Sequence, residues 1–275
     1  MERRAFDFVP LNRRDRKPRK RGLTEMRGPY YTPMGTRYLR DILETVGDWV
    51  DTLKFSGGSF ALMPRARVAE LITIAHEHSV TVSTGGFIEH ILTLKREDLV
   101  DRYIDECKQL GFDIVELSVG FITMPGDDLV RLVHRVKQAG LLAKPEVGIQ
   151  FGAGGDSSVE QLEAEGQRDV RRAIELARKC LQAGAWMIMI ESEGITENVR
   201  QWRTEAVSAI ADELGLDKVM FEAADPAVFA WYVKNYGPDI NLFVDHTQVV
   251  QLEALRSGIW GTQSLFGRVV TYRGE

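Results

Sequence analysis

The sequence predicts an α/β protein of the (β/α)8 barrel class, in which eight parallel strands alternate with helices. Short β-branched, apolar runs alternate with longer segments whose apolar residues recur every three or four positions, and eight such pairs follow residue 22. No stretch rich in Ser, Pro or Gly interrupts them, so we expect one barrel domain over residues 22–275. A doubly wound parallel sheet is the alternative, because local periodicity does not show whether a sheet closes.

The expected strands are short apolar runs bounded by polar residues or glycine. They are Gly22–Met26, Val50–Phe55, Val80–Ser83, Ile114–Val119, Leu142–Ile149, Trp186–Glu191, Lys218–Glu222 and Leu242–Asp245.

A segment with helical periodicity follows each strand. In order, these segments are Thr36–Val46, Arg65–His78, Glu97–Leu110, Asp127–Ala139, Val159–Ala183, Glu197–Leu214, Asp225–Tyr236 and Thr247–Ser257. The first carries an apolar stripe at Leu39, Ile42, Leu43 and Val46. The Asp225–Pro226 pair is typical of a helix start, with a capping side chain followed by proline. Several segments end in glycine, as at Gly111 and Gly184.

Composition excludes several classes of protein. The chain has 275 residues, and 35 basic against 40 acidic side chains give a net charge of −5. No apolar run approaches the roughly 20 residues of a membrane span, and Met1 is followed by charge rather than by a signal-peptide core. Two cysteines, Cys107 and Cys180, make neither a disulfide scaffold nor a C-x-x-C motif. We therefore expect a cytoplasmic protein with no membrane contact.

The charge is unevenly distributed. Residues 1–28 contain ten Lys/Arg and four acidic residues, a net +6, which leaves −11 for the rest of the chain. Residues 1–21 are therefore predicted to be a basic N-terminal extension. A basic arm for nucleic acid is one interpretation. A solvated, partly disordered leader is the favoured one, because no aromatic-interleaved basic surface follows it. We accordingly expect no nucleic-acid partner.

Polar side chains stand at the carboxyl end of every expected strand, where barrel enzymes carry their active sites. Six of the eight are acids, and the exceptions are a lysine and a threonine. The set is Glu25, Lys54, Thr84, Glu116, Glu146, Glu191, Glu222 and Asp245. Strand alternation places these side chains on the inner face and Val115, Ala143 and Ile188 on the outer face. We therefore expect the acids to point into the barrel mouth.

A buried carboxylate is costly unless it is paired or binds a cation. One interpretation is a hard-cation site, most plausibly Mg²⁺ held by Glu116, Glu146 and Glu191, because carboxylate oxygens suit Mg²⁺ and no His/Cys cluster competes. The other is a buried ion-pair network in which Lys54 and Lys144 neutralise the acids. The strand-end pattern alone supports both.

Glycine-rich turns follow the second and third strands, at Ser56–Gly57–Gly58–Ser59 and Thr84–Gly85–Gly86. Backbone N–H groups at such turns can approach an anion. We predict that Ser56, Gly57, Gly85 and Gly86 bind an anionic substrate together with Lys54 and Glu222. Tight βα turns without a ligand are the alternative.

The remaining chemistry-bearing residues are less informative. The histidines form no zinc pattern, and only His246, at the end of the eighth strand, is placed for acid–base work. A Schiff-base aldolase acting through Lys144 or Lys54 is a further possibility.

Ordered motifs along the chain resemble the phosphosulfolactate synthase family, which also includes plant heat-stress-associated proteins. The motifs are Val50–Phe55, Thr84–Gly86, Leu110–Ser118, Glu146–Gly148, Ala183–Ala185, Phe221–Ala223 and Leu252–Gly258. The resemblance extends from about Gly22 to Gly267. It implies Mg²⁺-dependent addition of sulfite to phosphoenolpyruvate, giving 2-phospho-3-sulfolactate, and small anionic substrates as the partners. A homo-oligomer is possible.

The resemblance also implies catalytic roles for Lys54, Lys144 and Glu146. Archaeal members carry a lysine directly after the Glu-Val-Gly of the fifth strand, as proton donor. Here Glu146–Val147–Gly148 is followed by Ile149 and Gln150, and Lys144 is the candidate replacement. This difference leaves open a barrel enzyme for another phosphorylated or carboxylated three-carbon substrate, or a non-catalytic, stress-associated barrel.

Overall fold

Eight parallel strands form a closed barrel in chain order, from β1 to β8. The computed structural model describes residues 4–150, 157–165, 169–223, 225–261 and 265–272. The strands are β1 (Thr24–Arg27), β2 (Thr52–Lys54), β3 (Thr81–Ser83), β4 (Ile114–Leu117), β5 (Leu142–Val147), β6 (Ile188–Ile190), β7 (Val219–Glu222) and β8 (Leu242–Asp245). Because β1 pairs with β8 from Thr24↔Leu242 to Arg27↔Asp245, the sheet closes on itself. The predicted barrel is confirmed, and the doubly wound alternative is wrong.

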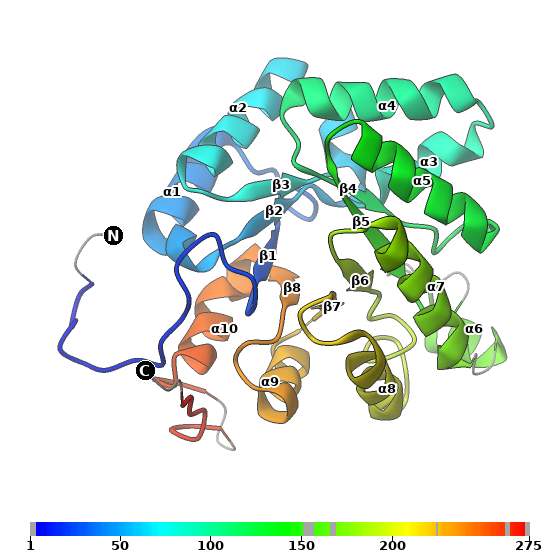
Figure 1. Ribbon diagram of the computed structural model, residues 1–275. Coiled ribbons are helices and arrows are strands. Elements are labelled where there is room, and N and C mark those ends of the chain that lie inside the picture. The colour runs from blue at the N-terminus through cyan, green and yellow to red at the C-terminus, as the bar shows by residue number, and fades with distance from the viewer. Residues whose placement is uncertain (1–3, 151–156, 166–168, 224, 262–264, 273–275) are drawn as a thin grey trace.

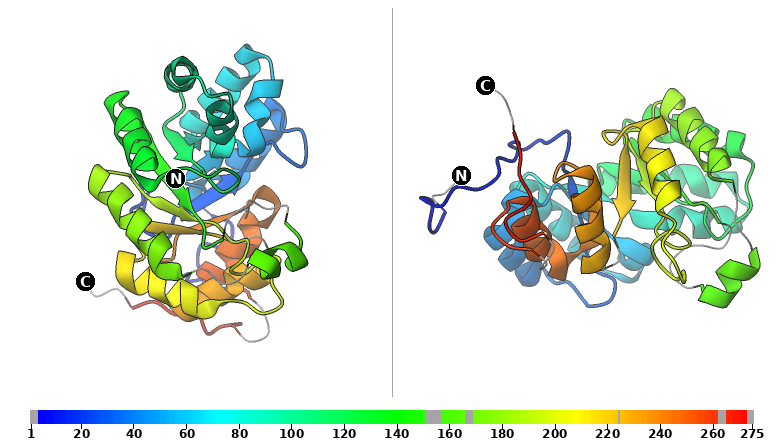
Figure 2. Two further views of the ribbon diagram at one scale, coloured as in Figure 1. Left: turned by 90° about the vertical axis from the view of Figure 1, so that its right-hand side faces the viewer. Right: turned by 90° about the horizontal axis from the view of Figure 1, so that it is seen from below.

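Helices surround this barrel, as Figure 1 shows in a view close to its axis. They are α1 (Thr36–Val46), α2 (Arg65–Glu77), α3 (Ile88–Thr93), α4 (Glu97–Leu110), α5 (Gly126–Gln138), α6 (Val159–Glu165), α7 (Val170–Ala183), α8 (Thr204–Leu214), α9 (Pro226–Tyr236) and α10 (Val249–Arg256). The second view in Figure 2 shows them packed against the outside of the strands.

Helix ends follow the local signals in the sequence. Asp225 caps α9 by accepting hydrogen bonds from the amides of Ala227 and Val228, directly before Pro226. Gly111 and Gly184 end α4 and α7 in the left-handed conformation, with φ of 97° and 93°. The predicted end signals at these positions are confirmed.

Three helix predictions differ from the structure. Helix α3, in the loop after β3, was not predicted because the helix is only six residues long, too short to show helical periodicity. The expected helix Val159–Ala183 contains α6 and α7, and residues 166–168 between them lie outside the described chain. Helix α8 begins at Thr204 rather than at Glu197. The Glu197 carboxylate instead accepts a hydrogen bond from Ser192 at 2.6 Å and belongs to the loop after β6.

Apolar side chains form two separate clusters that reveal which face of each strand points inward. Ile188 and Ile190 of β6 pack in the large cluster between barrel and helices, which also holds Val115, Leu117, Ala143 and Val147. Met187 and Met189, one residue out of phase, belong to a small cluster inside the barrel with Leu23, Met220 and Phe243. The predicted alternation is therefore confirmed.

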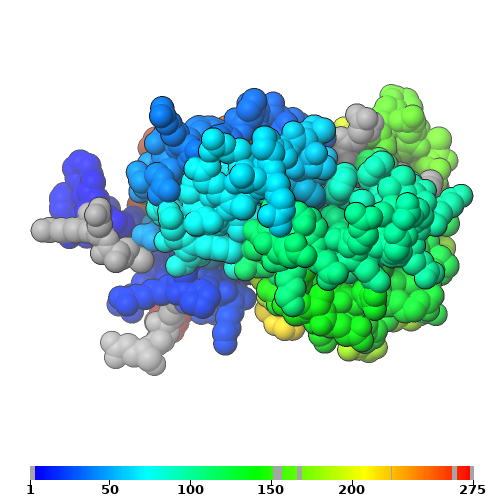
Figure 3. Space-filling view, turned by 90° about the horizontal axis from the view of Figure 1, so that it is seen from above, coloured from blue at the N-terminus to red at the C-terminus, as the bar shows by residue number. Residues whose placement is uncertain are grey.

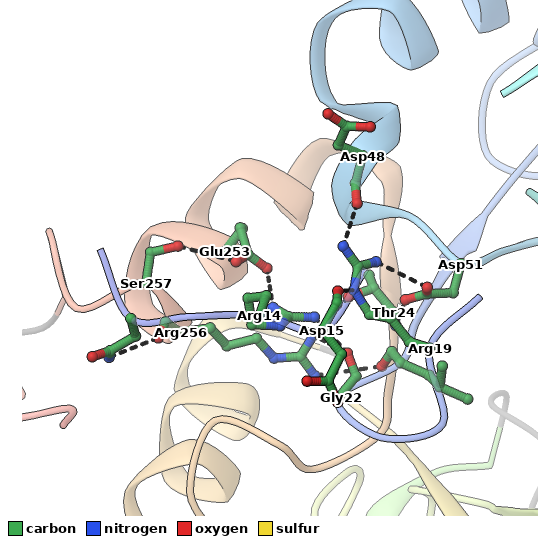
Figure 4. A network of polar contacts seen from close by, with 12 residues as sticks. Arg14, Asp15, Arg19, Gly22, Thr24, Asp48, Asp51, Glu253, Arg256 and Ser257 are labelled. Atoms are coloured by element: carbon green, nitrogen blue, oxygen red, sulfur yellow. Dashed lines mark hydrogen bonds and ion pairs between the residues drawn. The ribbon is translucent and has the colours of Figure 1, made fainter. Parts of the chain in front are cut away.

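The N-terminal extension packs under the barrel rather than extending as a solvated leader. Arg14 forms an ion pair with Glu253 of α10, and Arg19 contacts Asp51 at 2.9 Å (Figure 4). These arginine side chains are only 4% and 3% exposed, so they are not available to a nucleic-acid backbone. Residues 4–10 are exposed and project from the body (Figure 3, darkest blue). The favoured interpretation of a solvated leader is thus wrong for the second half of the extension.

Both ends of the chain meet at this face. The Asn12 side chain donates to the carbonyl oxygens of Arg256 and Val269, at 3.0 and 2.7 Å. The segments before β1 and after α10 emerge on the same side (Figures 1 and 2). Among the described residues, no helix is long and apolar enough to cross a membrane.

Candidate active site at the carboxyl end of the barrel

The deepest polar group of the barrel is Lys144 on β5. Its Nζ lies 2.5 Å from both carboxylate oxygens of Glu25 and 3.0 Å from Glu116 Oε2, and all three side chains are essentially unexposed. The expectation that every strand-end acid points into the mouth is therefore wrong for Glu25. The register explains it: Arg27, not Glu25, pairs with Lys54 and Asp245, so Glu25 lies one inward position deeper.

Lys54 on β2 links this deep cluster to the mouth. Its Nζ lies 2.8 Å from Glu116 Oε1 and 3.7 Å from Glu146 Oε2, and 4.3 Å from the centre of the Phe243 ring. Burial alone would lower the pKa of the ammonium, but Glu116 and Glu146 outweigh burial and raise it. Lys54 is therefore held as a cation, which opposes a Schiff-base role that requires a neutral amine.

Glu116 is fully neutralised by these two lysines. Burial favours its protonated form, but Lys54 and Lys144 outweigh burial and lower its pKa. For Glu25 and Glu116, the ion-pair interpretation therefore describes the structure.

Two carboxyl groups closer to the mouth are less well compensated, because Lys54 does not outweigh their burial and their carboxylate neighbours. Burial, together with the charge of Glu116, raises the pKa of Glu146 from its usual 4.5 to about 7, and Ser118 Oγ donates to its Oε1 at 2.7 Å. Burial and the nearby Glu222 and Glu146 raise the pKa of Glu191 well above its usual value. Within the described chain, Glu191 has no lysine or arginine partner and accepts only from the Glu193 amide, at 2.9 Å.

Arg27, at the end of β1, is a site residue that the sequence reasoning missed. Its Nη2 donates to Glu222 Oε1 at 3.1 Å, and its guanidinium lies 5.0 Å from the Tyr31 ring and 4.9 Å from the Phe243 ring. Strand alternation from Glu25 to Arg27 was the signal that could have found it. The predicted strand ended at Met26, one residue too early.

The glycine turns are held by packing. A Cβ on Gly57 would lie 2.3 Å from the Tyr30 ring, and one on Gly85 would lie 2.6 Å from the Phe55 carbonyl oxygen. Ser56 Oγ, in contrast, is buried in the turn after β2 and has no hydrogen-bond partner among the described residues. The packing supports the tight-turn interpretation for these glycines, while the buried Ser56 hydroxyl keeps unused hydrogen-bonding capacity.

Other predicted residues lie outside the charged cluster. Thr84 Oγ1 is buried, donates to the Gly85 carbonyl and accepts from the Glu116 amide at 3.1 Å, so it supports the backbone. Asp245 caps the turn after β8 by accepting from the amide and hydroxyl of Thr247. The glycine-rich stretch 152–155 lies outside the described residues.

The donor chemistry fits a divalent cation at Glu146 and Glu191. Clustered buried carboxylates with raised pKa values are stabilised in their charged form when a hard cation binds them. No group of three or more His, Cys, Asp or Glu side chains is already gathered for a metal among the described residues. Glu116, the third predicted ligand, has both carboxylate oxygens within 3.0 Å of a lysine ammonium.

The closed parallel barrel with a charged cluster at the carboxyl ends of its strands defines the class of the protein as a (β/α)8 barrel with an enzyme-like site. The (2R)-phospho-3-sulfolactate synthase (ComA) family matches residues 12–262, and the chain belongs to that family. The family is one of enzymes, so the resemblance seen in the sequence is confirmed.

Individual relatives divide into two groups. The Arabidopsis thaliana protein HEAT-STRESS-ASSOCIATED 32 is 41% identical over 253 residues, covering 88% of both chains. The phosphosulfolactate synthases of Methanothermobacter thermautotrophicus and Methanocaldococcus jannaschii are 28% and 26% identical. The alignment with the Methanothermobacter enzyme covers 94% of this chain and 96% of the relative. The alignment with the Methanocaldococcus enzyme covers 91% of this chain and 96% of the relative.

Solved structures share the fold at low identity. The carboxyl transferase domain of Rhizobium etli pyruvate carboxylase with pyruvate superposes with a TM-score of 0.57 and 14% identity, over 83% of this chain and 40% of that one. A 2,3-dimethylmalate lyase of the PEP mutase/isocitrate lyase superfamily gives 0.51 and 15%, over 86% and 78%. These similarities support the barrel fold alone.

Proposed function

We propose that the protein is a phosphosulfolactate synthase-like carbon–sulfur lyase that adds sulfite to phosphoenolpyruvate with Mg²⁺ to give 2-phospho-3-sulfolactate. The proposal rests on one observation, a cationic lysine beside buried carboxyl groups at the mouth of the barrel. Lys54 is a fixed cation, and beside it Glu146 and Glu191 are buried carboxyl groups with raised pKa values. Such a site can hold a carboxylated substrate through a cation and supply a positive charge beside it.

Lys54 is the residue of this chain that would stabilise the negative charge developing on the substrate. Attack by sulfite on the methylene carbon moves an electron pair toward the substrate carboxylate, and the adjacent carbon must then be protonated. The Lys54 side chain is 6% exposed and lies nearer the mouth, whereas the Lys144 side chain has no exposure and three carboxylate oxygens around its ammonium. We therefore assign proton donation to Lys54 and a structural role to Lys144.

Glu146 and Glu191 are the proposed Mg²⁺ ligands, and Glu116 orients Lys54. When bound, Mg²⁺ would polarise the substrate carboxylate and offset the repulsion among these carboxyl groups. Ser118 fixes the Glu146 carboxylate through its hydrogen bond, and the Ser56 hydroxyl offers a donor to the substrate phosphate.

Incubation of the pure protein with phosphoenolpyruvate, sulfite and Mg²⁺, followed by phosphorus NMR, tests the activity directly. We expect 2-phospho-3-sulfolactate to accumulate, and Lys54→Met to slow its formation by at least about 100-fold, as removal of a general acid does. Lys179→Met, on the exposed face of α7, should leave the rate unchanged. Absence of product from the wild-type protein would refute the proposal.

One observation favours a second candidate, a barrel enzyme for another phosphorylated or carboxylated three-carbon substrate. The residues after Glu146–Val147–Gly148 are packed away: Ile149 is in the core, and Gln150 donates to the Leu162 carbonyl at 2.8 Å. Substrate exchange in the same NMR assay, with pyruvate or phosphoglycerate in place of phosphoenolpyruvate, separates the two candidates. If no substrate turns over while Mg²⁺ still binds, a non-catalytic barrel protein is the better description.

A further inference from the structure

Exposed apolar side chains are concentrated at the two ends of the chain. Half of the large ones that the described chain exposes lie in residues 4–10, 259–261 and 265–272, which make up less than a tenth of it. They are Phe6, Phe8, Val9, Ile259, Trp260, Phe266, Val270 and Tyr272. Single exposed apolar residues are normal on a protein surface, whereas a group of them marks an interaction site.

Both chain ends lie on the face of the barrel opposite the candidate active site. β1 begins at Thr24, and Arg256 at the end of α10 donates to the Gly22 carbonyl, so both ends leave the barrel at the amino ends of the strands. The Asn12 amide donates to the Ser257 carbonyl at 3.0 Å, which holds the two segments together. They project on the same side of the molecule in Figures 1 and 2. The chain-end surface is defined as residues 4–21, 257–261 and 265–272.

The chain-end surface also carries positive charge that is not neutralised within the described chain. Five of its basic residues are exposed and form no ion pair with a described residue. They are Arg4, Arg13, Arg16, Lys20 and Arg268. Its acids are Asp7 and Asp15, and Arg21 contacts Asp15 Oδ2 at 3.1 Å. The excess of exposed cations favours an anionic partner.

The aromatic side chains of this surface protrude in two pairs. Phe6 and Phe8 pack edge to face with 6.1 Å between ring centres, and Trp260 and Phe266 do so at 5.2 Å. Phe8 is 80% exposed and Trp260 is 65% exposed. The cavities of 560, 610 and 310 Å³ on the described chain have none of these rings in their walls. A folded partner would need a matching pocket for each pair, whereas a lipid interface accepts protruding apolar side chains without a matching shape.

The aliphatic members of the group distinguish lipid from nucleic acid. Single-stranded nucleic acid binds to basic surfaces by stacking its bases on aromatic rings. Val9, Ile259 and Val270 offer no such ring, but they gain free energy when they leave water for an apolar phase. The mixture of cations, aromatic rings and aliphatic side chains therefore fits an anionic lipid surface best.

We propose that the chain-end surface binds anionic phospholipid bilayers, with its cations on the headgroups and Phe8 and Trp260 inserted below them. Charge and insertion act together, since one weak signal alone gives only marginal binding. The expectation of no membrane contact came from the lack of an apolar span, and binding at the bilayer surface requires none. The barrel mouth would face away from the bilayer and stay open to small substrates. The inference is independent of the reaction proposed above.

Cosedimentation of the full chain with phospholipid vesicles tests the surface. We expect binding to vesicles that contain phosphatidylserine, weaker binding at high salt, and none to pure phosphatidylcholine. The triple variant Arg13→Gln, Arg16→Gln, Lys20→Gln should bind at least about 30-fold more weakly, because each cation near such a surface contributes about fivefold. Trp260→Ser should bind at least about fivefold more weakly, because the indole no longer leaves water.

Two matched variants change other faces of the molecule. The triple variant Arg131→Gln, Arg171→Gln, Lys179→Gln removes the same number of exposed cations from α5 and α7. Leu62→Ser removes an exposed leucine in the turn after β2. We expect both variants to bind vesicles as the wild type does. Circular dichroism checks that every variant is folded, and Trp260→Ser decides the outcome if the first triple variant is not.

The inference is overturned if phosphatidylserine vesicles do not bind, if both triple variants weaken binding equally, or if Trp260→Ser leaves it unchanged. Sedimentation velocity without lipid and titration with polyuridylate test the other occupants. An oligomer that Trp260→Ser dissociates would make this surface an interface between copies of the chain. Polyuridylate that binds and displaces the vesicles would make it a nucleic-acid surface. Either result also overturns the inference.

Discussion

At the scale of single residues, depth inside the barrel divides the acidic side chains into two kinds. Glu25 and Glu116 lie deep and are matched by Lys144 and Lys54. Glu191, nearer the mouth, is left without a cation partner among the described residues, and its pKa is raised by burial and by Glu222. Paired carboxylates and a carboxylate without a cation partner in the described chain therefore coexist in one strand-end pattern, at different depths in the barrel.

Glu116→Gln tests the buried ion-pair network. The substitution removes the negative charge between two buried ammonium groups, so we expect the free energy of unfolding to fall by about 3 kcal/mol, the cost typical of breaking a buried ion pair. Urea denaturation measures it. Glu106→Gln, which breaks an exposed pair with Arg65, is the control and should cost less than about 1 kcal/mol. Equal effects of the two substitutions would contradict the buried network.

The raised pKa of Glu146 predicts a pH dependence of stability. Its carboxyl group binds a proton more tightly in the folded than in the unfolded state, so its contribution is present below pH 4.5 and is lost as the pH rises to about 7. Relative to wild type, Glu146→Gln should gain stability across this window, by at most about 3 kcal/mol. Urea unfolding at several pH values, with chelator to remove divalent cations, measures the difference. A difference independent of pH would contradict the assignment.

At the scale of elements, the chain ends close the bottom of the barrel. Arg256 at the end of α10 is completely buried and donates to the Thr24 hydroxyl at 2.6 Å and the Ile240 carbonyl at 2.5 Å. Burial lowers its pKa to about 9, so its hydrogen bonds rather than solvent stabilise the charge (Figure 4). These contacts join α10 to β1 and to the segment before β8, where the barrel closes.

Deletion of residues 1–21 therefore should destabilise the barrel. It removes the buried Arg14–Glu253 and Arg19–Asp51 pairs and leaves two carboxylates uncompensated. We expect the melting temperature to fall by roughly 10 °C, from a loss of about 3–5 kcal/mol. The matched control is deletion of residues 1–10, most of which are exposed, with an expected change below about 2 °C. If both truncations melt like the full chain, the extension is not part of the folded unit.

The helix boundaries show where apolar periodicity in the sequence predicts the structure well. The α1 and α9 segments were predicted to within one residue, because stripe and end signals coincide there. The predicted start of α8 was seven residues early, because Glu197 continues a locally plausible helical pattern but bonds to Ser192 instead. A tertiary hydrogen bond overrode local propensity at that loop.

At the scale of the whole molecule, Mg²⁺ should act as a stabilising ligand. A cation that binds only the folded state stabilises it by about 2.7 kcal/mol at 100 times its Kd, which raises the melting temperature by roughly 5–10 °C. Differential scanning fluorimetry with increasing Mg²⁺ measures this shift. Glu191→Gln should abolish most of it, whereas Glu205→Gln, exposed in the first turn of α8, should not. An unchanged shift in Glu191→Gln would remove that residue from the metal site.

The sequence alone determined the eight alternating strands and helices, the inward face of the strands and the carboxylates at strand ends, because strand alternation and helical stripes are local properties of the chain. Only the tertiary structure decided which charges meet. The closure of β1 onto β8 brings Arg27 level with Lys54 and Asp245, and the register places Glu25 against Lys144. Pairing of side chains 119 residues apart depends on register and burial, which no local pattern encodes. The basic extension packs under the barrel for the same reason, because desolvated charges are stable only beside oppositely charged partners that folding brings to them.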